Sequence, residues 1–139
     1  MKKFLILSLI LLLQACANLG EHYQPMQPPE NEAIVYFYRP SRFFGMAISF
    51  DIKEKDKVIT AMPNNGYYPH QTTVGEHTYT VESIENTDSV TINVEKGESY
   101  YISSMLNWGM FVGRPQLEVV SNEDRAVSEI KDCKLIIKD

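Results

Sequence analysis

The chain has 139 residues, 44% of them hydrophobic, and a formal net charge of −5 at pH 7. This length is enough for one domain with a real hydrophobic core. The negative charge argues against nucleic acid as a partner and against electrostatic docking on anionic lipid.

The first sixteen residues predict a secretory signal that ends at a lipid-attachment cysteine. Two lysines precede an apolar run over residues 4–13 that contains a single Ser8, and the small residue Ala15 precedes Cys16. The export machinery recognises a cationic start, a short apolar core and a small residue at the cleavage site. The run is too short for a membrane-spanning helix, which needs about 20 residues. Residues 13–16, Leu-Gln-Ala-Cys, resemble the bacterial lipobox, in which the cysteine sulfur receives diacylglycerol and the freed amine is then acylated, as by palmitate.

We therefore expect residues 1–15 to be removed and the mature protein to be held at the membrane by lipid on Cys16. One acyl chain holds a protein only marginally, whereas several make release negligible. Residues 16–32 lack periodicity and contain three prolines, which predicts an extended lipidated tether. Ala17 stands where an aspartate commonly marks retention in the inner membrane. We therefore expect an outer-membrane protein that faces the periplasm.

From residue 33 onward the pattern has the period of two that is typical of β-strands. In residues 33–39 both faces are apolar or aromatic, which predicts a central strand covered on both sides. Further short runs follow, separated by turn residues rather than helices. Strands spaced this closely predict a mainly β fold, a single antiparallel β-sandwich over residues 33–139. The further runs cover residues 47–53, 57–61, 66–71, 77–83, 89–95, 99–106 and 116–120.

A helix is expected only near the C-terminus. Residues 121–124, Ser-Asn-Glu-Asp, are typical of a helix cap with acids in the first turn. An apolar stripe follows, which we expect to lie over the outer face of the first strand. Residues 134–138 could instead form an edge strand. The stripe consists of Ala126, Ile130, Cys133 and Ile137.

Cys133 is the second of only two cysteines in the chain. Because lipidation uses the sulfur of Cys16, no intrachain disulfide is available to it. We interpret Cys133 as a small buried side chain. The alternative is an intermolecular disulfide.

Four short motifs together resemble the markers of domain of unknown function 2846, a family of small bacterial proteins, many of them lipoproteins, with no established activity. The resemblance covers roughly residues 33–120 and implies a small β-sandwich of transthyretin-like or immunoglobulin-like build. It supplies no catalytic residues. One departure is residues 53–57, where a charged and longer connection replaces the family's tight glycine-containing turn. The motifs are Tyr36-Phe37-Tyr38-Arg39-Pro40, Gly66-Tyr67-Tyr68, Val-Gly-Glu-His-Thr-Tyr at 74–79 and Lys-Gly-Glu-Ser-Tyr-Tyr-Ile at 96–102.

The sequence contains no recognised catalytic motif. It lacks a Gly-x-Ser-x-Gly elbow, a glycine-rich phosphate loop, a Cys-x-x-Cys pair and a His-Glu-x-x-His helix. His77 is expected to lie partly buried near a strand end. A metal site formed by His70, His77 and a carboxylate is the alternative. We predict no enzymatic activity, no cofactor and no metal.

Polar residues near strand ends are interpreted as structural. Arg39 is expected to hold a carboxylate or loop carbonyls rather than a ligand. Acids at strand ends and in turns are expected to form a solvated rim. These acids are Glu82, Glu85 and Asp88.

The most suggestive surface is apolar. Residues 43–46 are Phe-Phe-Gly-Met and residues 108–113 are Trp-Gly-Met-Phe-Val-Gly, and both segments fall between predicted strands. Large apolar side chains are unusual in solvated turns, and aromatic residues and Met are enriched at interfaces. Two such loops at one end of the sandwich would make a single patch. Alternatively, they plug the core or belong to a strand. The candidate partner-binding residues are Phe43, Phe44, Trp108, Met110 and Phe111.

Two kinds of function follow from these observations. The first is a non-enzymatic, lipid-anchored module that binds an unknown protein or envelope component. The second is a small periplasmic hydrolase or inhibitor that acts on cell-wall material, which would need polar groups that converge in a cleft.

Overall fold

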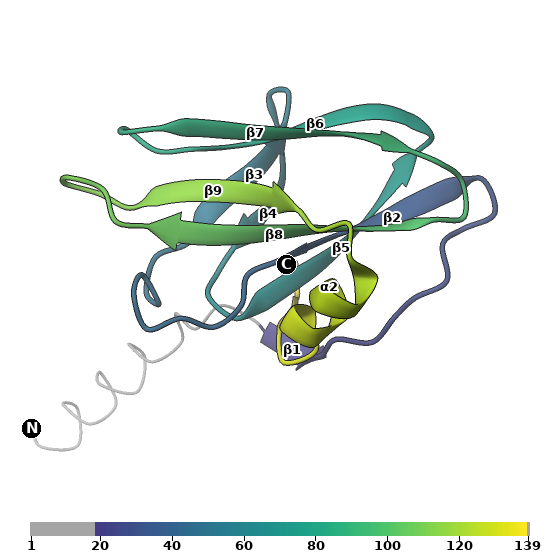
Figure 1. Ribbon diagram of the computed structural model, residues 1–139, viewed down its shortest axis with the longest axis horizontal. Coiled ribbons are helices and arrows are strands. Elements are labelled where there is room, and N and C mark those ends of the chain that lie inside the picture. Colours follow the sequence, from purple (N-terminus) through teal and green to yellow (C-terminus); the bar gives the residue numbers. More distant parts are fainter. Residues whose placement is uncertain (1–18, 139) are drawn as a thin grey trace, which may run out of the picture.

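The computed structural model describes residues 19–138, which form two β-sheets and one short helix (Figure 1). The helix is capped by Asn122, whose side-chain oxygen accepts a hydrogen bond from the Arg125 N–H at 2.9 Å. The elements are β1 (Leu19–His22), β2 (Glu32–Tyr38), β3 (Phe50–Glu54), β4 (Lys57–Met62), β5 (Gly66–Thr73), β6 (Gly75–Glu82), β7 (Thr87–Val94), β8 (Ser99–Asn107), β9 (Arg114–Val119), α2 (Glu123–Ile130) and β10 (Lys134–Ile136).

The two sheets pack as layers of a sandwich. One has six strands in the order β1-β10-β5-β2-β8-β9, and the other has four in the order β4-β3-β6-β7. The helix α2 lies against the outer side of the six-stranded sheet (Figure 1). The predicted mainly β sandwich with a C-terminal helix is therefore confirmed.

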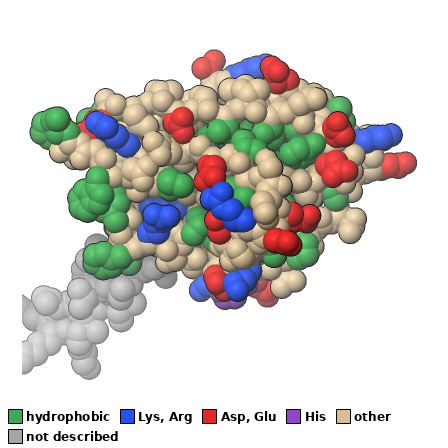
Figure 2. Space-filling view, viewed as in Figure 1, with side chains coloured by type: hydrophobic (Ala, Val, Ile, Leu, Met, Phe, Trp, Pro, Cys, Tyr) green, Lys and Arg blue, Asp and Glu red, His purple; other side chains and the backbone are tan. Residues whose placement is uncertain are grey.

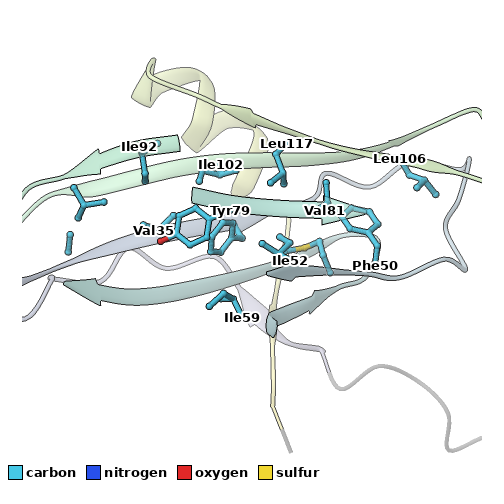
Figure 3. Packing of buried hydrophobic residues seen from close by; sticks show 14 residues of the cluster. Val35, Phe50, Ile52, Ile59, Tyr79, Val81, Ile92, Ile102, Leu106 and Leu117 are labelled. Carbon is cyan, nitrogen blue, oxygen red and sulfur yellow. The ribbon is translucent and has the colours of Figure 1, made fainter. Parts of the chain in front are cut away.

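The strand β2 is central and buried on both faces, as its sequence predicts. Its inner face packs between the sheets (Figure 3), where Val35 and Phe37 belong to one continuous apolar core. The Phe37 ring lies edge-on to Tyr79 of β6, with centroids 4.8 Å apart. Val81 of β6 and Ile102 of β8 fill the same interior. The core is thus built by side chains that point inward at alternate positions along each strand.

The outer face of β2 is covered by α2 and by the chain that precedes β2. Tyr36 and Tyr38 are fully buried there, and the Tyr38 hydroxyl donates to Glu129 on α2 at 2.6 Å. The Tyr36 hydroxyl accepts from the Met26 N–H at 2.9 Å. A buried phenol costs free energy unless its hydroxyl has a partner, and both have one.

The predicted C-terminal stripe is confirmed for Ala126, Ile130 and Cys133, all of which are buried. Ile137 is half exposed, because α2 ends at Ile130 and a strand follows. That strand, β10, lies between β1 and β5 rather than at the sheet edge. Burial raises the pKa of the Cys133 thiol to about 12, so it stays protonated, as expected of a small buried side chain.

Two strand pairs correct the expectation of a wholly antiparallel sandwich. β2 pairs with β8, and β10 pairs with β5, in parallel. Short turns force antiparallel pairing only between strands that are neighbours in sequence. Five strands lie between β2 and β8 in the sequence, so no short turn fixes their relative direction. Packing within the six-stranded sheet sets it instead.

Residues 19–26 also differ from expectation, because they are tied to the sandwich where the sequence suggests part of a tether. β1 pairs with β10, and the Tyr23 N–H donates to the Cys133 carbonyl at 3.1 Å. The Tyr23 ring is buried and lies edge-on to Tyr36 and Tyr67, with centroids 5.3 and 5.5 Å apart. Aromatic burial in this geometry outweighs the freedom of a linker.

The predicted longer connection at residues 53–57 is wrong. Only Lys55 and Asp56 separate β3 from β4, and Glu54 pairs with Lys57. The turn closes because Lys55 adopts a left-handed conformation with φ of 53°. A non-glycine residue tolerates this region at modest cost, so the tight turn survives without its glycine.

Candidate functional site

Three loops meet at one end of the sandwich, on the left in Figure 1. They are the β2–β3 loop (39–49), the β6–β7 turn (83–86) and the β8–β9 loop (108–113). Hydrophobic side chains gather on this end of the surface (Figure 2). We call it the apolar end and define it by Phe43, Phe44, Met46, Ile84, Trp108, Met110 and Phe111.

Most of these side chains project into solvent. Five of them are 77–91% exposed. Single exposed apolar side chains are ordinary, but a cluster on adjoining loops is typical of an interaction site. The five are Phe43, Ile84, Trp108, Met110 and Phe111.

The two loops singled out in the sequence lie in direct contact. The rings of Phe44 and Trp108 stack with centroids 3.7 Å apart and planes 25° from parallel. Phe44 is partly buried and packs on the inner core, so it does plug the end of the sandwich. Phe43 does not plug it, since its side chain is 91% exposed. The structure therefore places the predicted loops in one patch, with Phe44 as its inner edge.

Glu85 of the β6–β7 turn holds the β8–β9 loop in place. Its two carboxylate oxygens accept the backbone N–H groups of Met110, Phe111 and Val112 at 2.5–3.1 Å. The Arg114 side chain donates to the same carboxylate at 3.0 Å. These donors, the Phe111 N–H foremost, lower the pKa of Glu85 to about 2. The expected solvated rim is thus wrong for Glu85, since its carboxylate is engaged by the loop.

The other two acids of the expected rim differ from each other. Asp88 accepts the backbone N–H of Leu117 at 2.9 Å and so joins β7 to β9. Glu82 is half exposed and forms an ion pair with Lys53. Such exposed pairs contribute little to stability.

Arg39 holds the base of the β2–β3 loop. Its guanidinium donates to the Ile48 carbonyl at 2.6 Å and to the Gly45 carbonyl at 2.9 Å, and it lies 5.2 Å from the Phe50 ring centroid. The side chain is only 2% exposed, and burial lowers its pKa. The sequence predicts that Arg39 holds a carboxylate or loop carbonyls, and in the structure it donates hydrogen bonds to loop carbonyls. Because these carbonyls bond to Arg39, β3 begins at Phe50 rather than at residue 47.

Gly45 lets this loop approach the sheet. It has φ of +71°, and a Cβ there would lie 2.5 Å from Leu106. Both the left-handed backbone and the close approach therefore require glycine.

A cavity of about 560 Å³ opens between the sheets behind the apolar end. Its walls are largely apolar and include Phe111, so the tip of the β8–β9 loop forms one side of its mouth. The ion-paired Lys53 and Glu82 lie at its rim. The principal apolar lining residues are Ile48, Phe50, Leu106, Phe111, Val112 and Pro115.

The histidines lie elsewhere. His77 Nδ1 is 2.6 Å from a Glu54 oxygen, its Nε2 is 2.8 Å from the Thr73 carbonyl, and its ring stacks over Tyr79. This is the partly buried position that the sequence predicts. Burial lowers the pKa of His70. Within residues 19–138, no three His, Cys, Asp or Glu side chains are grouped so as to hold a metal ion.

The predicted signal (residues 1–15) and the lipidation site Cys16 lie outside the described residues. In the described part of the chain, no helix has the length and apolar character needed to cross a membrane.

Sequence reasoning missed Ile84, and it named Glu85 only as a rim acid, not as the residue that holds the β8–β9 loop. The signal that could have found Ile84 is a large apolar residue between Ser83 and Glu85, where a turn is expected to be polar. No local signal marks Glu85, because its partners lie 25–27 residues away in the chain.

Comparison with known proteins gives one family and one similar relative. The model of the family described as "Protein of unknown function (DUF2846)" matches residues 29–114, a range that contains the three loops of the apolar end. An uncharacterized protein of Haemophilus influenzae is 30% identical over 135 residues, which cover 90% of this chain and 80% of the relative. No solved structure matches the chain.

Proposed function

The chain belongs to the DUF2846 family, and on that premise we propose that it is a lipid-anchored protein of the bacterial envelope whose apolar end binds a partner. The proposed role is non-enzymatic, and the partner is a protein or another component of the envelope. The observation that carries the proposal is the contact between Phe44 and Trp108, which joins two exposed apolar loops into one patch.

The anchor is supported by the first sixteen residues. Lipid on Cys16 would hold the mature chain at the outer membrane, facing the periplasm. A protein held in this way needs no high affinity for a partner in the same compartment, because confinement raises the effective concentration of both.

The binding role is supported by how the apolar end is built. Its loops are fixed by the side chains of Glu85 and Arg39 rather than by burial of their tips. Fixed loops whose apolar tips stay in water suit the binding of a partner. A surface that is already ordered loses less conformational entropy when it binds. Of the two acids that line the nearby cavity, Glu82 is ion-paired with Lys53 and Asp51 is exposed, so we favour binding over hydrolysis there.

The anchor is tested by Cys16→Ser in cells supplied with a labelled fatty acid. We expect the wild-type protein to carry the label and to fractionate with the outer membrane. We expect the variant to carry no label. A labelled variant would contradict the assignment of Cys16.

The binding role is tested by photo-crosslinking in intact cells from a probe placed at position 110. We expect crosslinked adducts that disappear when Trp108→Ser and Phe111→Ser are added. The matched control is Val74→Ser, which changes an exposed apolar residue between β5 and β6 and should leave the adducts intact. Adducts that persist in the double variant would show that the apolar end is not the contact.

A further inference from the structure

We propose that the partner of the apolar end is the lipid surface itself, so that the loop tips insert into the same bilayer that holds the lipid on Cys16. This inference deepens the proposed function and rests on it. It commits to a bilayer rather than to a protein.

The shape of the apolar end fits a bilayer interface. Its five most exposed side chains stand on three separate loops, and Figure 2 shows hydrophobic side chains gathered at this end of the surface. A protein partner would need a surface shaped to fit all three loops. A bilayer interface accepts any arrangement of such tips, and Trp is enriched at the level of lipid headgroups.

The anchor is covalently close to the packed domain. Cys16 is three residues before Leu19, so their Cα atoms lie within about 11 Å of each other whatever the intervening conformation. The sequence alone suggests a tether that continues to residue 32. Because residues 19–26 are tied to the sandwich, the domain is held against the bilayer rather than at a distance from it.

β1 follows the attachment point, and its far end, at His22, is linked to the base of the β2–β3 loop. β1 and β2 are separated by three strand spacings in the six-stranded sheet, about 14 Å. Hydrogen bonds also join the end of β1 to the β2–β3 loop across two neighbouring turns. These bonds are His22 Nδ1 with the Asp132 carbonyl, the Lys134 N–H with the Asn65 carbonyl and the Arg42 N–H with Asn64 Oδ1.

Charge does not oppose this contact. The three loops, residues 39–49, 83–86 and 108–113, contain one acid, Glu85, and two bases, Arg42 and the buried Arg39. The Glu85 carboxylate is turned inward to three N–H groups and to Arg114. The loops therefore present no free carboxylate to anionic headgroups, although the whole chain is acidic.

Trp108 is the only tryptophan in the chain, so its fluorescence reports on the apolar end alone. The lipidated protein is reconstituted into vesicles of phosphatidylethanolamine and phosphatidylglycerol, with and without brominated acyl chains. We expect brominated lipid to quench the fluorescence of Trp108 strongly. We also expect iodide in the buffer to quench wild-type Trp108 several-fold less than it quenches Trp108 in a triple variant. That variant combines Phe43→Ser, Met110→Ser and Phe111→Ser. A matched control combines Trp108→Phe with Val74→Trp, which moves the single tryptophan to the β5–β6 turn, where iodide should reach it freely.

The outcomes separate the two proposals. If the protein carries no lipid and does not float with vesicles, the anchor is wrong and the proposed function fails. If it floats with vesicles but Trp108 stays open to iodide and unquenched by brominated lipid, the insertion is wrong and the anchor stands. Protection of Trp108 that appears only after envelope proteins are added would overturn the bilayer as partner in favour of a protein.

Discussion

Two aromatic regions of this molecule, the outer face of β2 and the apolar end, are handled in opposite ways. On the outer face of β2 the aromatic residues are tyrosines, buried beneath α2 and the chain before β2. At the apolar end they are Phe43, Phe44, Trp108 and Phe111, and only Phe44 packs on the core. The tyrosines of the first region are buried, while Phe43, Trp108 and Phe111 of the second lie in solvent.

The difference shows what each region contributes. The buried tyrosines have hydroxyl partners, as Tyr36 has in the Met26 N–H and Tyr38 in Glu129, so their burial contributes to stability. The exposed rings gain little from folding. Their loops are held by Glu85 and Arg39 rather than by burial of the rings, which is the basis of the proposed binding role.

The largest expected effect on stability comes from weakening the packing of α2 over the buried tyrosines. Ile130→Ala should lower the free energy of unfolding by about 2–5 kcal/mol, because Ile130, the last residue of α2, is fully buried against the sheet and its truncation leaves a cavity. Denaturant titration measures this. Val127→Ala on the same helix is the matched control, since Val127 is 37% exposed, and it should cost about 0.5 kcal/mol or less. Equal effects of the two substitutions would contradict the assigned packing.

An intermediate and local effect is expected at Glu85. Its pKa is lowered from 4.5 to about 2 in the folded protein, so its hold on the loop is complete above pH 4.5 and is lost as the pH falls toward 2. Trp108 emission should change over this range of pH. Glu85→Gln should remove the acid transition. A variant that keeps the wild-type transition would assign it to another group.

The smallest expected effect on stability comes from the apolar tips. Trp108→Ser and Phe111→Ser should each change the free energy of unfolding by about 0.5 kcal/mol or less, because both side chains are mostly exposed. Thermal and denaturant unfolding measure this. A large loss would place Trp108 in the core together with its stacking partner Phe44, and would remove the contrast between the two regions.

The sequence predicts the strands better than their assembly. Alternation locates β2 and its two apolar faces, because burial of a central strand leaves a local signature. The parallel pairing of β2 with β8 and the packing of Tyr23 depend on contacts between distant residues, which no local pattern encodes. The loops of the apolar end are recognisable because Phe and Trp are exceptional in turns. The hydrogen bonds from the β8–β9 loop to Glu85 are not predictable in this way, since an acidic residue in a turn is ordinary.

The placement of β1 has a practical consequence for anyone who shortens this chain. A recombinant fragment cut at residue 33, the start of the repeating apolar pattern, would lose β1 and Tyr23. It would leave β10 as a bare edge and uncover tyrosine rings beside it. Unpaired edges next to apolar surface template intermolecular pairing, so such a fragment should aggregate where one that starts at residue 19 stays monodisperse.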